Sequence, residues 1–221
     1  GVLLVILELT LIRFFWTFNL NLSEFMLAGV IWMIGWCMVI MAALIWLRAA
    51  LVGWLGLLIV FGQTLFQSVP TLMPETLQPG FGQWWEFIYP AGFEAPSPIS
   101  VLYVIGPWIG VMMTGYGFGL ILTKRASSRM RCIGIGLGCI VLFLTVGSWL
   151  ALSSENEMPF IYELLNQRKY RASALYLLMT IGPLILLVPF VDKLKGGLAK
   201  AVTIFGRVPF FYYLAHILII H

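Results

Sequence analysis

The chain has 221 residues, of which 61% are hydrophobic and only 10% are charged, and its mean hydropathy is +0.99. A soluble domain needs more charge to cover its surface, so this composition excludes a soluble globular protein. The net charge of +4 comes from basic residues near the ends of apolar segments. That placement argues against a nucleic-acid partner and is typical of membrane topology signals.

Seven apolar runs of about 17 to 24 residues, separated by polar joints, occupy most of the chain. At a rise of about 1.5 Å per residue, each run is long enough to cross a hydrocarbon core of about 30 Å as a helix. No polar stretch is long enough to fold separately. We therefore predict an all-α polytopic transmembrane bundle that forms one domain over residues 1–221. The predicted spans are Val2–Phe18, Phe25–Leu47, Ala50–Val69, Ile99–Leu122, Met130–Leu152, Ala172–Val191 and Ala201–Ile220.

The first run contains two ionisable residues, Glu8 and Arg13, and Asn19 continues its polar character. At the bilayer centre such a residue costs roughly 2.5–3.5 kcal/mol on insertion scales, so each needs a partner or a wet cavity. A separation of five residues places Glu8 and Arg13 about 140° apart on an α-helix, which argues against a pair within the helix. Both a structural clamp and a functional cavity fit this pattern.

The joint Pro70–Pro98 contains the segment Phe81–Pro90, in which aromatic residues surround Glu86. One interpretation is an interfacial aromatic belt that anchors a surface or re-entrant helix. The other is an external acceptor site, where Trp85 stacks on a sugar ring and Glu86 accepts a hydrogen bond from a hydroxyl.

The fourth run includes Thr114–Gly117, a TGYG sequence similar to the filter of potassium channels. A filter needs a pore helix and a re-entrant loop, and this segment lies inside a full-length run. Pro107 is expected to kink the helix. The GIGLG sequence at Gly134–Gly138 follows no strand, so it does not predict a dinucleotide-binding loop. Glycines four residues apart predict close helix packing at Gly106/Gly110, Gly115/Gly119 and Gly134/Gly138.

The last run begins with Arg207 between Gly206 and Pro209, so we expect the helix to bend or begin there. His216 follows Tyr212 by one turn within the apolar zone. It is either a buried neutral histidine bound to a hydroxyl or a proton carrier in a cavity. No Asp, Cys or second His stands beside it at metal-ligand spacing, so no metal site is predicted.

Basic and acidic joints alternate along the chain, and the positive-inside rule places the basic joints in the cytoplasm. We therefore expect a protein of the inner cell membrane, with the Gly1 end cytoplasmic and the His221 end external. The joints 70–98 and 153–171 are then external, and Arg168, Lys169 and Arg171 form a minor exception. The eight basic residues on the predicted cytoplasmic side are Arg48, Lys124, Arg125, Arg129, Arg131, Lys193, Lys195 and Lys200.

Three cysteines, Cys37, Cys132 and Cys139, are expected to be small apolar residues without a disulfide framework. We do not expect the first run to be a signal peptide, because no small-residue cleavage site follows it and six further runs do. The chain lacks an initiator Met and is still hydrophobic at His221, so further spans are expected on either side.

Five segments of the chain resemble the bacterial membrane proteins related to heparan-alpha-glucosaminide N-acetyltransferase. They are spread over nearly the whole chain, and the family pattern has proline where this chain has Arg171. The segments are RFFWTFN (Arg13–Asn19), AGVIWMIGWCM (Ala28–Met38), PWIGVMMTGYGFG (Pro107–Gly119), KYRASALYLLMTIGP (Lys169–Pro183) and FGRVPFFYYLAH (Phe205–His216).

The resemblance implies an enzyme that moves an acetyl group from cytoplasmic acetyl-CoA to a sugar amine or hydroxyl on the external side. The key catalytic histidine of that family has no counterpart in the first three runs, and we expect it on a missing N-terminal part. What the resemblance carries over is a supporting cavity, with His216 as a candidate catalytic residue; its residues are Arg13, Asn19, Trp108, Tyr116, Arg207 and His216, the first four of them for the substrate. Separately, the basic cytoplasmic side can attract the phosphates of acetyl-CoA, and we predict Arg207 and Arg125 as the contacts.

Two other functions are weighed beside the acyltransferase. A transporter or flippase for a lipid-linked or small anionic solute would use Glu8, Arg13, Arg207 and His216 along its path, but we recognise no inverted repeat among the runs. A structural membrane subunit would use them only as clamps. Membrane lipid and a sugar or glycan acceptor are the expected partners, nucleic acid is not, and a homo-oligomer is left open.

Overall fold

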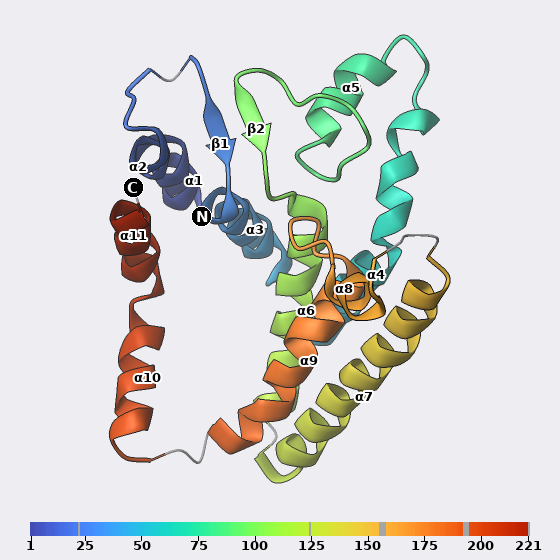
Figure 1. The fold of residues 1–221 in the computed structure, drawn as a ribbon, viewed down its shortest axis with the longest axis vertical. Coiled ribbons are helices and arrows are strands. Elements are labelled where there is room, and N and C mark those ends of the chain that lie inside the picture. The colour runs from blue at the N-terminus through green and yellow to red at the C-terminus, as the bar shows by residue number, and fades with distance from the viewer. Residues whose placement is uncertain (22, 124, 155–157, 192–194, 221) are drawn as a thin grey trace.

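The computed structural model describes residues 1–21, 23–123, 125–154, 158–191 and 195–220, and for residues 125–127 and 198 the backbone alone. The described chain is mostly helical (Figure 1). Three residues named in the predicted orientation lie outside the described residues: Lys124, Lys193 and His221.

Four helices in the described residues are long and apolar enough to cross a membrane. Only 17–33% of the residues in their apolar windows are buried inside the protein. Because the exposed remainder is largely apolar, these helices suit contact with lipid, as a helical membrane bundle requires. The four are α4 (Ala49–Gly62) with the 3₁₀ segment Gln63–Ser68, α6 (Ile105–Thr123), α7 (Arg125–Leu152) from Ser128 onward, and α9 (Ala174–Val191).

Seven full spans are not confirmed. The first two runs form shorter helices, and α3 (Val30–Leu44) has 15 residues. At about 1.5 Å per residue that is roughly 22 Å, less than a hydrocarbon core of about 30 Å. The seventh run is divided into α10 (Gly197–Arg207) and α11 (Pro209–Ile220), which meet at 82°. If this bent pair counts as one span, the described chain has five.

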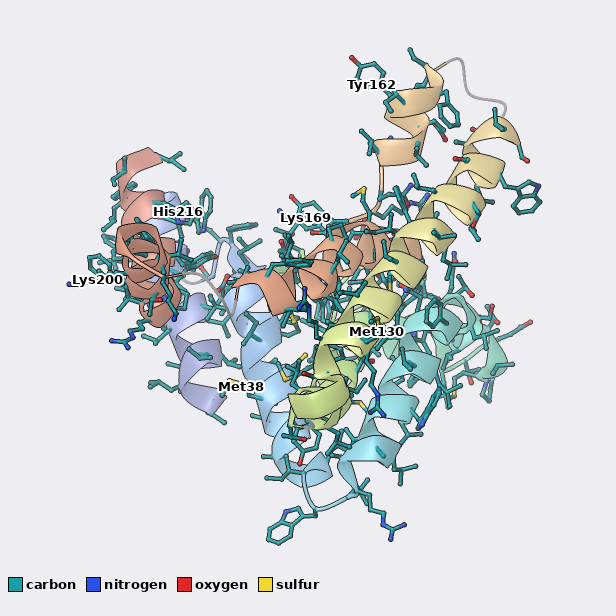
Figure 2. The ribbon with its side chains drawn as sticks, turned by 90° about the horizontal axis from the view of Figure 1, so that it is seen from below. Met38, Met130, Tyr162, Lys169, Lys200 and His216 are labelled. Atoms are coloured by element: carbon teal, nitrogen blue, oxygen red, sulfur yellow. The ribbon has the colours of Figure 1, made fainter. Side chains whose placement is uncertain are left out.

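The bend in the seventh run lies where it was expected. Val208 precedes Pro209, and proline disfavours the helical conformation of the residue before it. Val208 accordingly has φ −130° and ψ 46°, outside the helical region. Every residue from Lys200 to Pro209 is exposed, and Figures 1 and 2 show α10 standing apart from α6 and α7.

The most extensive helix–helix contacts are those of α4 with α6 and of α7 with α9. A Cβ on Gly53 would lie 2.9 Å from the Cα of Gly117, and a Cβ on Gly56 would lie 2.6 Å from the carbonyl oxygen of Gly110. No side chain other than hydrogen fits at such distances, so the glycines allow the two backbones to touch.

The predicted glycine packing is right in kind and partly wrong in register. The predicted pair Gly106/Gly110 makes close contacts. The other four predicted glycines face open space, and Gly117 and Gly136 make close contacts instead; the four are Gly115, Gly119, Gly134 and Gly138. Both helices carry glycine on more than one face, and only the position of the partner helix selects the face that packs.

Pro107 lies in the first turn of α6, which continues as one helix from Ile105 to Thr123. An amide in the first turn has no acceptor within its own helix, so proline removes no hydrogen bond there. The predicted kink is therefore not found. The Thr114–Gly117 segment is helical, as expected.

The loops that carry β1 and β2 are joined at one end of the molecule, at the top of Figure 1. Strand β1 (Met26–Ala28) pairs in parallel with β2 (Ile99–Val101), with Met26 opposite Ile99. The amides of Ile105 and Gly106 donate to the carbonyls of Phe87 and Ile88. We call residues 18–21, 23–29, 86–104 and 167–172 the loop layer. Two short helices lie beside it, α5 (Gln78–Trp85) and α8 (Phe160–Leu165).

The segment 167–172 is fixed to the rest of this layer by polar and aromatic contacts. The indole N–H of Trp108 donates to the Tyr170 carbonyl at 3.3 Å, and the rings of Tyr103 and Tyr170 meet edge to face at 5.2 Å. Gln63, which is buried, donates to the Ala172 carbonyl at 3.1 Å. The segment 167–172, which leads into α9, is therefore attached to α6 through Trp108 and to the end of α4 through Gln63.

Candidate functional site

The first helix carries two buried ionisable residues at its middle and far end. It consists of α1 (Val2–Leu7), a π-helical turn (Glu8–Ile12) and α2 (Arg13–Thr17). In the π turn the Arg13 amide donates to the Glu8 carbonyl. Because this ring closes over five residues rather than four, Glu8 and Arg13 lie closer together around the helix than the predicted 140°. π turns occur frequently at functional sites.

Arg13 is bound by main-chain carbonyls of the loop layer. Its Nη1 donates to the Asn19 carbonyl at 2.7 Å, and its Nε and Nη2 donate to the carbonyls of Phe25 and Asn21. The residue is only 2% exposed. The planar guanidinium therefore holds the turn after α2 against the helix end. This geometry matches the predicted structural clamp.

Asn19, a predicted substrate residue, belongs to the same turn. Its Nδ2 donates to Glu24 Oε2 at 2.7 Å, and Asn21 Nδ2 donates to Glu24 Oε1 at 2.8 Å. The amide group of Asn19 is thus engaged within the loop layer.

Glu8 differs from Arg13, because neither of its carboxylate oxygens has a hydrogen-bond partner in the described part of the chain. It is 1% exposed and lies against the start of α3, where the amides of Gly29, Ile31 and Trp32 surround it. A Cβ on Gly29 would overlap Glu8 Oε1. The glycine therefore leaves the space in which the carboxylate sits.

A hydroxyl from the last helix lies near this carboxylate. Tyr213 of α11 interacts electrostatically with Glu8 and with Tyr103, and it accepts a hydrogen bond from the Trp16 indole. Tyr103 is buried in the loop layer and is hydrogen-bonded to Lys169. The structure thus brings Glu8, Tyr213 and Tyr103 from three distant parts of the sequence into one region.

The aromatic segment before β2 is held by its own main chain. Trp85 donates its indole N–H to the Phe66 carbonyl at 2.9 Å and stacks on Phe81 at 5.4 Å. Glu86 Oε1 accepts from the amides of Ala91 and Phe93 at 2.7 and 2.9 Å. These contacts favour the structural interpretation of Trp85 and Glu86 over the acceptor site.

Trp108 and Tyr116, both on α6, lie in different surroundings. Trp108 packs at 5.9 Å from the Tyr103 ring and contacts the loop layer. Tyr116 is 40% exposed, two turns further along α6. Only Trp108 is therefore near the Glu8 region.

His216 and Arg207 lie on the arm formed by α11 and α10, where Figure 2 labels His216 and Lys200. His216 is exposed, so its interpretation as a buried histidine is wrong. Its Nδ1 lies 3.0 Å from the Tyr212 carbonyl, and its ring meets Tyr213 at 5.4 Å. Arg207 is exposed at the end of α10.

Arg125 begins α7, and its side chain is not among those described. Figures 1 and 2 show α10 apart from the start of α7, so the fold does not bring Arg125 and Arg207 together.

The hollows on the surface of the described chain include one beside the first helix and one beside the loop layer. One, of about 390 Å³, lies beside the first helix and is lined by Thr10, Leu11, Arg13, Phe14 and Leu20. The other, of about 280 Å³, is polar and lies between α7, α8 and the start of α9. Glu8 is 1% exposed and lines neither of these two hollows, so its carboxylate is closed off from solvent in this packing.

The three cysteines are free, and Cys37 and Cys132 are buried, as small apolar residues would be. Within the described ranges no three His, Cys, Asp or Glu side chains are grouped as metal ligands.

Sequence reasoning singled out Glu8 but did not find its neighbours. Tyr213 lies four residues before Ile217, which is fully buried, so helical periodicity could have placed it on the inward face. Tyr103 carried no such pattern.

Comparison with protein families, with curated proteins and with solved structures returned no match.

Proposed function

We propose that the chain is the membrane bundle of an acyltransferase, which moves an acetyl group from cytoplasmic acetyl-CoA to a sugar amine or hydroxyl on the external side. In this proposal all seven runs cross or enter the inner membrane, with Gly1 cytoplasmic and the loop layer external. The five segments that resemble the N-acetyltransferase family support the class of reaction.

The observation that carries the proposal is the buried Glu8 carboxylate next to the loop layer. Ionisable residues within a membrane mark functional sites by default. Acylation breaks the N–H or O–H bond of the acceptor and the C–S bond of the thioester, forms the new acyl bond and returns the proton to the departing thiolate. A carboxylate is suited to hold that proton in between, and the hydroxyls of Tyr213 and Tyr103 are suited to bind the oxyanion.

The joined loop layer favours an enzyme over an alternating-access transporter. A transporter must separate its outer ends in every cycle. Here β1 and β2 are paired, and the segments 23–29 and 86–104 are linked by main-chain hydrogen bonds. Such a layer is suited to a fixed acceptor site.

Acetyl-CoA enters this proposal as a substrate, and Arg207 is the described residue that we assign to its phosphates. The guanidinium is exposed at the end of α10 and can bind phosphate through two parallel hydrogen bonds. Arg125 is not placed near it, so we do not assign the two arginines to one phosphate group.

The test uses the purified full-length protein in liposomes, including any spans that flank residues 1–221, with labelled acetyl-CoA inside and glucosamine outside. We expect acetylated sugar outside and an equal amount of free CoA inside. Exchange of solute across the membrane without loss of acetyl-CoA would support the transporter instead and would overturn the proposal.

Single substitutions then assign the roles. Arg207→Ala should raise the KM for acetyl-CoA, whereas Lys200→Ala, on the same exposed helix, should leave it unchanged. His216→Ala should lower kcat while the amount of folded protein stays constant. Equal KM changes in Arg207→Ala and Lys200→Ala would reject the phosphate contact.

A further inference from the structure

Among the residues that the structure describes, no charged side chain pairs with the Glu8 carboxylate. On its own helix, the donors of Arg13 are directed to the carbonyls of Asn19, Asn21 and Phe25. Helix α3 contributes main-chain amides near Glu8, and its buried Cys37 contacts Met33. The loop layer contributes Tyr103 with Lys169, and α11 contributes Tyr213 and the exposed His216.

Magnitudes decide the charge state of Glu8 in this packing. The start of a helix stabilises a nearby anion by about 0.3–1 kcal/mol, and up to about 2 kcal/mol in partly buried sites. Burying an unpaired ion costs several kcal/mol even after relaxation. The desolvation cost is larger, so the neutral carboxylic acid is the stable form here.

Helix α11 packs beside the π turn that carries Glu8, whose carboxylate also lies against the start of α3. Its Ile217 is fully buried against Ile12 and Ile31, and its Tyr213 hydroxyl accepts a hydrogen bond from the indole of Trp16. Before it lies the 82° bend at Val208, preceded by an α10 that is exposed from Lys200 onward. A hinge at this bend would let α11 move away while the pairing of α1 with α3 is kept.

We propose that Glu8 is a proton-binding site beneath α11, and that loss of its proton requires α11 to open and admit water. Closed α11 and protonated Glu8 form one state, and open α11 and hydrated carboxylate form the other. Rising pH favours the open state, because opening releases one proton. This inference does not depend on acyl transfer, and it is tested without acetyl-CoA.

Infrared spectroscopy tests the proton on Glu8 directly. At neutral pH the wild-type protein should show the carbonyl stretch of a protonated carboxylic acid, and this band should be lost at high pH. Glu8→Gln should lack the band at every pH. Glu86→Gln is the matched control and should keep it, since Glu86 is bonded to two amides. A wild-type spectrum without a Glu8-dependent band would overturn the proposal.

Cysteine labelling tests the movement of α11. In a background with Cys37, Cys132 and Cys139 replaced by alanine, Ile217→Cys is buried and Ile219→Cys is 82% exposed. The ratio of their maleimide rates cancels the pH dependence of the thiol itself. It should rise about tenfold per pH unit while the closed state predominates, because one proton is released per opening.

Adding Glu8→Gln should make this ratio independent of pH. The same pH dependence with and without Glu8 would overturn the proposed coupling. If Ile217→Cys fails to fold, Leu214→Cys, which packs in the same cluster, replaces it.

Discussion

The contact of α1 with α3 and the contact of α4 with α6 are built on the same principle and differ in what they enclose. In both, a glycine lets the backbones approach: Gly35 against Val5 in the first, and Gly53 against Gly117 in the second. Yet the first pair encloses Glu8 and ends at Arg13, whereas the second encloses only small and apolar side chains.

Since the α4–α6 contact shows that glycine packing alone can join two helices here, the charged residues of the α1–α3 contact are not needed for helix association. Buried charges are expensive in a membrane and are usually associated with function. We conclude that the α1–α3 region is the better candidate for a site, and that α4–α6 is its support.

The largest effect is expected from Arg13→Ala. It removes the donors of three partly buried carbonyls in the loop layer, and a hydrogen bond to a charged group contributes roughly 1.5–3 kcal/mol. Thermal unfolding in detergent should show a clear loss of stability. Arg13→Lys keeps the charge but not the planar fork, so it should recover only part of it. Unchanged stability in Arg13→Ala would show that the hydrogen bonds from Arg13 to the loop layer do not stabilise the fold.

A smaller effect is expected from Gly117→Ala. Its new Cβ would lie 2.6 Å from the Cα of Gly53, and the backbone there cannot move without separating the helices. Overpacking of this kind typically costs about 1–3 kcal/mol. Gly119→Ala, on the same helix but facing open space, is the matched control and should be neutral or stabilising. Equal effects of the two would contradict the observed register.

The next effect is that of Gly29→Ala. Its Cβ would meet the Glu8 carboxylate, which is the end of a flexible side chain, so the expected loss is near 1 kcal/mol, at the low end of overpacking. The double variant Gly29→Ala with Glu8→Ala should be less destabilised than the sum of the two single variants. Additive effects measured by thermal unfolding would show that the two residues do not touch.

The smallest effect is that of Glu8→Gln. If the Glu8 side chain is protonated and therefore neutral, its replacement by the neutral glutamine amide should change the free energy of unfolding by less than about 1 kcal/mol at neutral pH. Glu8→Lys keeps the length but adds a buried charge and should destabilise strongly. A large loss in Glu8→Gln would show that an ionised carboxylate supports the α1–α3 contact.

The class of protein and several local features followed from the sequence alone. Long apolar runs specify membrane helices, because the backbone in a hydrocarbon core must satisfy its own hydrogen bonds. The break before Pro209 also followed from local chemistry, since proline restricts the residue before it. So did the need of Glu8 and Arg13 for special surroundings.

Only the tertiary structure decided which of these features act together. Helix α6 has glycine on more than one face, and its sequence does not show which face packs. The position of α4 determines that Gly117 packs against it and that Gly119 does not. The π turn moved Glu8 and Arg13 toward one side of their helix, which no regular period predicts. The loop layer engaged Arg13, whereas within the described ranges no donor reaches hydrogen-bond geometry with the Glu8 carboxylate, because hydrogen bonding depends on groups that approach from distant parts of the chain.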